Sequence, residues 1–265
     1  MHRRHFLGTA FTALLLASSA TPAHADPIPV RQTQGTFHGM LLVRSPTGEI
    51  IGHGDFIQSV HGSRVTAELA LHFRDGSLDD EVTTFTQDST FRFVSDHHIQ
   101  RGPFFPASID FRLDATGQVT NRTIGKDGKE KVETQHIDLP TDVSNGMISN
   151  LLVNVRKDTP AFAVSMVLPS GKGRLAKLSI SPDSERTFTG GGVQRKATVF
   201  RVKIELGGVA GVVAPVIGKQ PDDVLIWILE GSAPTLLRVQ QQLYEGGPVV
   251  SLEMAGTTYP SPAAH

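Results

Sequence analysis

The chain has 265 residues, with 25 basic side chains, 26 acidic side chains and no cysteine. The balanced charge, without a Lys/Arg cluster, excludes the electrostatic pattern of nucleic-acid binding. The lack of cysteine excludes disulfides and thiolate metal sites, so the fold must be stabilised by a buried core.

Residues 1–25 have the pattern of an export leader. Arg3 and Arg4 precede an apolar run, and small residues follow up to Ala25, where the Ala-His-Ala spacing predicts cleavage. Residues 3–7 resemble a twin-arginine motif, and the Sec pathway remains an alternative. We therefore expect a bacterial protein that is periplasmic or secreted.

Cleavage after the leader defines the expected mature chain. Two of the 25 basic residues and none of the 26 acidic residues lie in the leader, which leaves 23 against 26 and a formal charge of −3. We expect a single β-rich domain over residues 26–258 and a frayed tail over 259–265. No segment of the mature chain is long and apolar enough to predict a transmembrane span.

Apolar and polar residues alternate between turn sequences such as Asp75-Gly76 and Asp127-Gly128. Within residues 66–73, one face carries Ala67, Leu69, Leu71 and Phe73. Alternation with this spacing of turns is typical of antiparallel strands with one buried face. The sequence therefore predicts a mainly β protein, with about a dozen strands in an antiparallel curved sheet that forms a half-barrel or barrel.

One segment has helical spacing instead. Met147, Ile148, Leu151, Leu152 and Val155 fall on one face of a helix. We expect a single short helix that plugs the open side of the curved sheet.

Residues 102–106 predict a rigid turn that carries Phe104 and Phe105. Core packing is the favoured use of the two rings, and the lip of a ligand site is the alternative.

The acidic run 75–81 and scattered histidines are the candidates for metal binding. His72, Asp79, Glu81, His98 and His136 can supply a His/carboxylate site for a divalent metal if they converge. Solvated carboxylates and isolated histidines are the simpler interpretation, so no cofactor is predicted and a divalent metal remains an alternative. Asp79 and Asp80 are neighbours, so on a strand they face opposite ways and form no acid/base dyad.

Familiar catalytic motifs are absent from the sequence. It contains no Gly-x-Ser-x-Gly elbow, no Ser-x-x-Lys and no His-Glu-x-x-His. The glycines of 211–220 have the wrong spacing for a phosphate loop. The catalytic residues, if any, are therefore unassigned.

The uncharged, glycine-rich segment 207–218 leads into the apolar run around Trp227. It is too short to cross a bilayer and too apolar for open water. We expect it to pack against the sheet or over a cavity mouth. Together with Phe104 and Phe105, Val212, Val216 and Trp227 are the candidate ligand-binding residues.

Three short stretches near the end carry a family resemblance. They are residues 225–229, Ala233-Pro234 and residues 237–239, which resemble the corresponding strands of uncharacterised exported bacterial families related to lipoprotein-carrier half-barrels. The resemblance implies an antiparallel sheet around an apolar cavity that accepts acyl chains.

Three function classes follow from these observations. The favoured one is an exported, non-enzymatic cell-envelope protein that binds an apolar or lipid-like ligand in a curved sheet. A hydrolase or metal-dependent enzyme with the His/carboxylate cluster is the second. The third is a structural or assembly protein that uses residues 207–218 as a contact.

Overall fold

The computed structural model describes residues 28–169, 173–206 and 221–258. Within them the chain forms a single antiparallel sheet of 15 strands and one short helix. The predicted mainly β fold with a curved sheet and one helix is confirmed, with more strands than the dozen expected.

The first eight strands form one wall as a meander in which each strand pairs with the next. Buried residues alternate with more accessible ones along β1, β3 and β4, as the period-two pattern predicts. The strands are β1 (Phe37–Arg44), β2 (Ile50–His61), β3 (Arg64–Phe73), β4 (Leu78–Gln87), β5 (Phe91–Arg101), β6 (Ala107–Asp114), β7 (Gln118–Gly125) and β8 (Glu130–His136).

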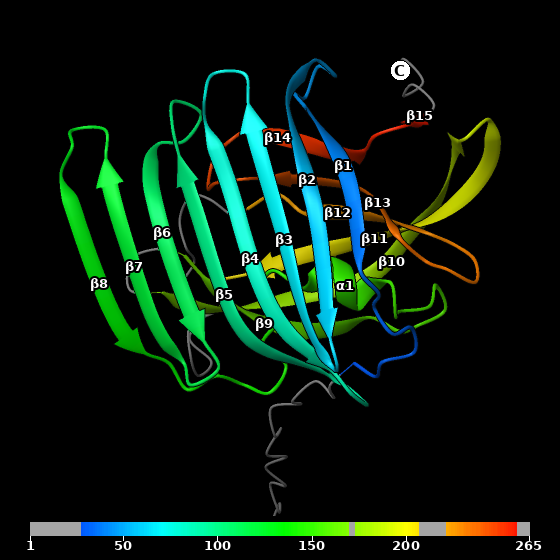
Figure 1. The fold of residues 1–265 in the computed structure, drawn as a ribbon, viewed down its shortest axis with the longest axis horizontal. Helices are drawn as coiled ribbons and strands as arrows, with labels where there is room; N and C mark the ends of the chain where they lie inside the picture. The colour runs from blue at the N-terminus through cyan, green and yellow to red at the C-terminus, as the bar shows by residue number, and fades with distance from the viewer. Residues whose placement is uncertain (1–27, 170–172, 207–220, 259–265) are drawn as a thin grey trace, which may run out of the picture.

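The remaining strands form the second wall, which joins the first through antiparallel pairing of β1 with β14. Figure 1 shows both walls curving around the helix α1 (Ile148–Leu152). The strands are β9 (Phe162–Leu168), β10 (Arg174–Gly190), β11 (Val193–Glu205), β12 (Val224–Leu229), β13 (Leu236–Gln242), β14 (Val249–Met254) and β15 (Thr257–Thr258).

The sheet remains unclosed, because β8 and β9 form no ladder with each other in the described ranges. Side-chain amides bridge the gap instead. The Gln135 Nε2 donates to the carbonyl of Gly173 at 2.8 Å, and the Asn121 Nδ2 donates to the carbonyl of Pro169 at 3.3 Å. The free edge of β9 is also covered, since residues 142–144 run beside Ser165 and exchange backbone hydrogen bonds with it.

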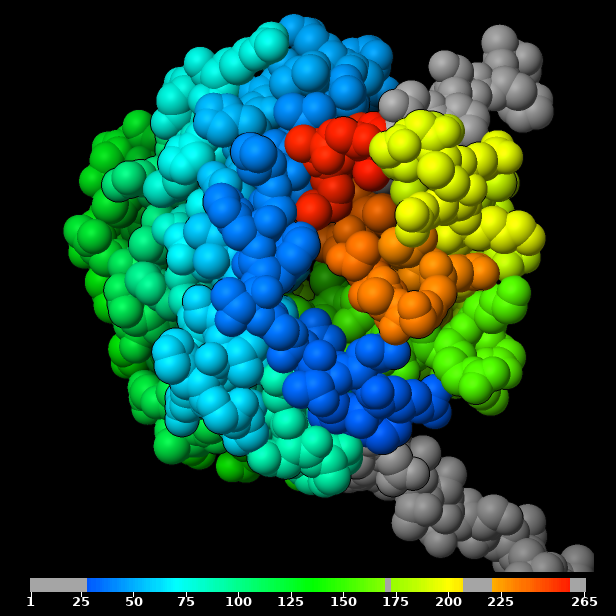
Figure 2. Space-filling view, turned by 45° about the vertical axis from the view of Figure 1, so that its right-hand side comes forward, coloured from blue at the N-terminus to red at the C-terminus, as the bar shows by residue number. Residues whose placement is uncertain are grey.

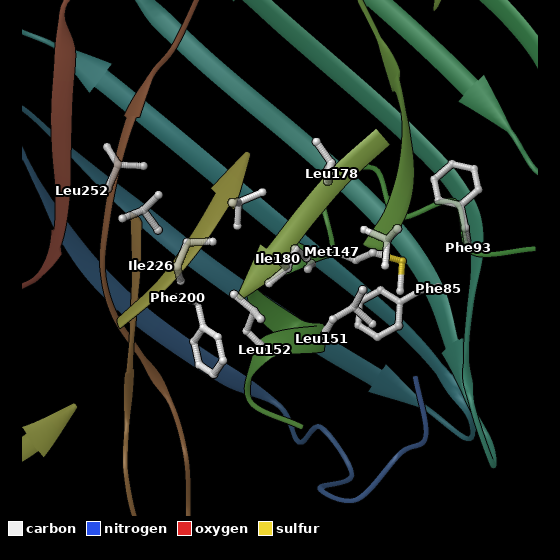
Figure 3. Close-up of a cluster of buried hydrophobic side chains, with 14 of the residues drawn as sticks. Phe85, Phe93, Met147, Leu151, Leu152, Leu178, Ile180, Phe200, Ile226 and Leu252 are labelled. Carbon is white, nitrogen blue, oxygen red and sulfur yellow. The ribbon is translucent and has the colours of Figure 1, made fainter. Parts of the chain in front are cut away.

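The expected helix is present but spans only five residues. It lies between the walls, where Met147, Leu151 and Leu152 are buried in the main hydrophobic core with side chains of both walls (Figure 3). This matches the predicted plug of the curved sheet. No helix in the described parts of the chain is long and apolar enough to cross a membrane.

The turn before the helix depends on a glycine. Gly146 has φ +59°, and a Cβ there would collide with the Thr83 hydroxyl on β4. The turn can therefore approach the inner face of β4 only because this residue has no side chain.

A second, smaller hydrophobic cluster lies on the opposite face of the second wall. It contains Phe188, Ala197, Val199, Trp227 and Leu237. In β12, Ile226 and Ile228 belong to the main core while Trp227 belongs to this outer cluster. The strand is therefore buried on both faces.

Candidate ligand cavity

The two walls enclose a cavity of about 450 Å³. Most of the side chains that line it are apolar, and they come from both walls. Examples are Leu41, Phe56, Leu69, Met166, Val202 and Ile226. Figure 2 shows the molecule hollowed between the N-terminal strands, in blue, and the β12–β13 region, in orange. The size falls in the range of ordinary small-molecule sites.

Four polar side chains of β4 and β5 interrupt this apolar lining, and we call them the polar wall. They are Asp79 and Glu81 on β4, and His98 and Gln100 on β5. The β4–β5 register places Glu81 opposite His98 and Asp79 opposite Gln100. Because alternate residues of a strand share a face, all four point to the interior.

Asp79 and His98 form a buried ion pair. The His98 Nε2 donates to the Asp79 Oδ1 at 2.6 Å, and the Gln100 amide donates to the Oδ2 at 3.1 Å. Burial by itself lowers the pKa of His98, but the hydrogen bond and the charge of Asp79, with the nearby carboxylates, raise this pKa to about 9. The imidazole therefore stays protonated at neutral pH, and both Asp79 oxygens are occupied.

Glu81 differs from its neighbours, because its carboxyl forms no hydrogen bond with any described residue. Burial and the charges of Asp96 and Asp79 raise the pKa of Glu81 to about 8, against a smaller opposing effect of His98. Glu81 is therefore mainly neutral at pH 7 and presents a carboxyl without a partner to the apolar cavity.

Asp96 lies deeper than these four residues and has a structural role. Its Oδ1 accepts from the Thr83 hydroxyl at 3.1 Å and its Oδ2 from the Asn145 amide at 3.4 Å. The Asn145 side chain also pairs with the backbone of Val167 in β9. Burial raises the pKa of Asp96. This network ties β4 and β5 to the second wall.

The structure brings together only part of the predicted metal set. Asp79, Glu81 and His98 meet in the polar wall, whereas His72 is exposed on the outer face of β3, stacked 5.7 Å from His53. His136 is exposed on β8, near the surface Asp138. The convergence expected of His72 and His136 with His98 does not occur. No three acidic or histidine side chains in the described residues are placed to hold a metal ion.

Phe104 and Phe105 belong to an aromatic group and do not line the cavity. The Phe104 ring stacks 4.5 Å from that of Phe73, and both phenylalanines contact Tyr244, which does line the cavity. Core packing, the favoured interpretation, is therefore what the structure shows for this turn.

Trp227, another predicted ligand residue, does not line the cavity. Trp227 faces away from it, in the outer cluster, with the Arg238 guanidinium 5.0 Å from its ring. The interpretation of Trp227 as a lining residue is corrected, because strand alternation turns Ile226 inward and Trp227 outward. Val212, Val216 and the rest of residues 207–220 lie outside the described residues.

Four residues of the site were not among the predicted ones: Asp96, Gln100, Thr83 and Asn145. A signal for the first three was present in the alternation of their strands. Asp96 and Gln100 are two residues from His98, and Thr83 is two residues from Glu81, so each pair shares a face. Asn145 had no comparable signal, because it lies in a turn.

The sequence matches no protein-family model and no curated protein. Among solved structures, this chain is similar to a beta-barrel-like protein of a domain of unknown function, DUF1849, from Brucella abortus. The two are 7% identical, with a TM-score of 0.44, over 86% of this chain and 100% of that chain.

Proposed function

We propose that this chain is an exported cell-envelope protein that binds an apolar or lipid-like small molecule in the cavity between its walls. The observation that supports the proposal is the 450 Å³ cavity lined by apolar side chains of both walls. Burial of apolar ligand surface there contributes about 25 cal/mol per Å² before the costs of association. Export rests on the leader-like residues 1–25 and is tested by N-terminal sequencing of the exported protein, which we expect to begin at Asp26.

Uptake of the neutral apolar dye N-phenyl-1-naphthylamine tests the binding proposal, because its fluorescence rises in apolar surroundings. We expect saturable uptake by the mature protein. Leu69→Trp places a large ring in the cavity and should reduce uptake at least tenfold. Ile57→Trp is the matched control, because Ile57 is 36% exposed on the outer face of the adjacent β2. Absence of saturable uptake, or equal uptake by both variants, would contradict the proposal.

His98 is poorly suited to be the general base of the hydrolase alternative at neutral pH. A general base needs a neutral imidazole, and the pKa of His98, about 9, keeps this side chain charged. Its Nε2 is also occupied by Asp79. These features support a role of the polar wall in ligand binding, where a fixed charge pair is no disadvantage.

A further inference from the structure

We propose that the cavity selects an amphiphile with a cationic nitrogen head group, which Glu81 binds while the apolar lining holds the tail. This inference rests on the proposed function and assigns the chemical class of the ligand. It follows from the carboxyl groups at the polar wall, because Asp79 and Asp96 accept hydrogen bonds from neighbouring side chains and Glu81 accepts none from the described residues.

Three carboxyl groups gather here, and two of them are fully engaged. Asp79 accepts from His98 and Gln100, and Asp96 accepts from Thr83 and Asn145 through the contacts given above. Of these three carboxyl groups, only Glu81 faces the cavity without a hydrogen-bond partner among the described residues. A ligand head that reaches the polar wall therefore meets an acid as its first available group.

The surrounding charges favour a cation over an anion. The single imidazolium of His98 is offset by Asp79, so an anionic head would be added to a site that already holds two further acids, Glu81 and Asp96. A cationic head supplies the positive charge that a buried carboxylate lacks, and charge-assisted hydrogen bonds are about twice as strong as neutral ones.

Among the described residues, the other charged groups that line the cavity are exposed. They are Arg174, Asp222 and Glu245, two acids and one base. Their balance also favours entry of a cation. Arg174 and the His98 imidazolium are the described lining groups that can attract an anionic head, and the experiment below includes that outcome.

Binding of a cation must displace a proton. In the empty cavity the raised pKa of Glu81 keeps its carboxyl protonated at pH 7, and an ammonium group pairs with the ionised form. With a pKa of about 8, roughly 0.9 protons should leave for each ligand bound. An anionic or neutral ligand releases no proton from this group.

Isothermal titration calorimetry with three ligands of one tail length separates the alternatives. Dodecylamine, dodecanoic acid and 1-dodecanol are titrated into the mature protein at pH 7, in phosphate and in Tris, whose ionisation heats differ. We expect dodecylamine to bind at least tenfold more tightly than dodecanoic acid, with a buffer-dependent heat that reports proton release. Glu81→Gln should remove both the preference and the proton release. Glu68→Gln, on the outer face of the adjacent β3, is the matched control and should change neither.

The dye assay keeps the two proposals distinguishable. If the dye is not taken up, the proposed function fails. If the dye is taken up but the acid or the alcohol binds as tightly as the amine, the function stands and the cation inference is overturned. Lack of proton release by the wild type has the same consequence and requires no variant to fold.

Discussion

Glu81→Gln should make the protein more stable at pH 8 and have a much smaller effect at pH 5. The pKa of Glu81 rises from its ordinary value of 4.5 to about 8 on folding, chiefly through burial. Above pH 4.5 the unfolded chain releases this proton, while the folded chain keeps it until the pH reaches about 8. The folded state therefore binds more protons in this window, and its stability falls as the pH rises.

The two pKa values set the magnitude. Integrated from pH 5 to pH 8, this carboxyl lowers the unfolding free energy of the wild type by an upper limit of about 3.5 kcal/mol. Glutamine is neutral at every pH and resembles the protonated acid, so the variant lacks this contribution. His98, whose pKa also rises, destabilises both proteins as the pH increases from 6.5 to 9 and largely cancels in the comparison.

Urea unfolding at pH 5, 6, 7 and 8 measures the effect. The single tryptophan, Trp227, is buried and reports unfolding by fluorescence. The gap between Glu81→Gln and the wild type should widen by about 2 to 3.5 kcal/mol over this range. The control Glu68→Gln should show a constant offset. If the two variants have the same pH dependence, the assignment of a buried, proton-holding Glu81 is refuted.

Three further changes test the structure around the cavity. Gly146→Ala should lower the free energy of unfolding in urea by about 2 to 3 kcal/mol, because it combines positive φ with a clash. Gly128→Ala, at φ +75° in open space, should lower it by about 1 kcal/mol. Equal costs would contradict the close approach of the turn to β4. His98→Ala should cost about 3 kcal/mol at pH 7, because it removes one partner of a buried pair. His97 is partly exposed, and His97→Ala should cost less than 1 kcal/mol. A cost below 1 kcal/mol for both variants would refute the buried pair. Trp227→Ala should lower the free energy of unfolding by about 3 kcal/mol and leave dye uptake per folded molecule unchanged. A parallel loss of uptake would contradict the outward orientation of Trp227.

The strands and the helix could be predicted because their signals are local. Alternation along β3 and β11 fixes which residues are buried, and the spacing from Met147 to Val155 marks the helix. Alternation also placed Asp79 and Glu81 on one face. The pairing of β1 with β14 joins residues about 210 positions apart, and nothing local in the sequence specifies it.

The candidate site was harder to predict for a related reason. Which histidine meets Glu81 depends on the register between β4 and β5, which shifts at a bulge near Phe85. Five histidine and carboxylate candidates therefore could not be reduced to Asp79, Glu81 and His98. Trp227 was misplaced because the apolar residues of β12 serve two clusters, one on each face, and a continuous apolar run does not say which face borders a cavity.

The carboxyl groups of the cavity divide into those that hold the fold together and one that does not. Asp79 and Asp96 anchor hydrogen-bond networks that join strands, so their burial is offset by partners. Glu81 has no such partner, and its burial destabilises the protein at neutral and alkaline pH. A chain that needed only to fold would be more stable with glutamine at this position. A destabilising acid that faces an apolar cavity is a property expected of a ligand-binding group, and this contrast is the strongest physical reason to look for a cation there.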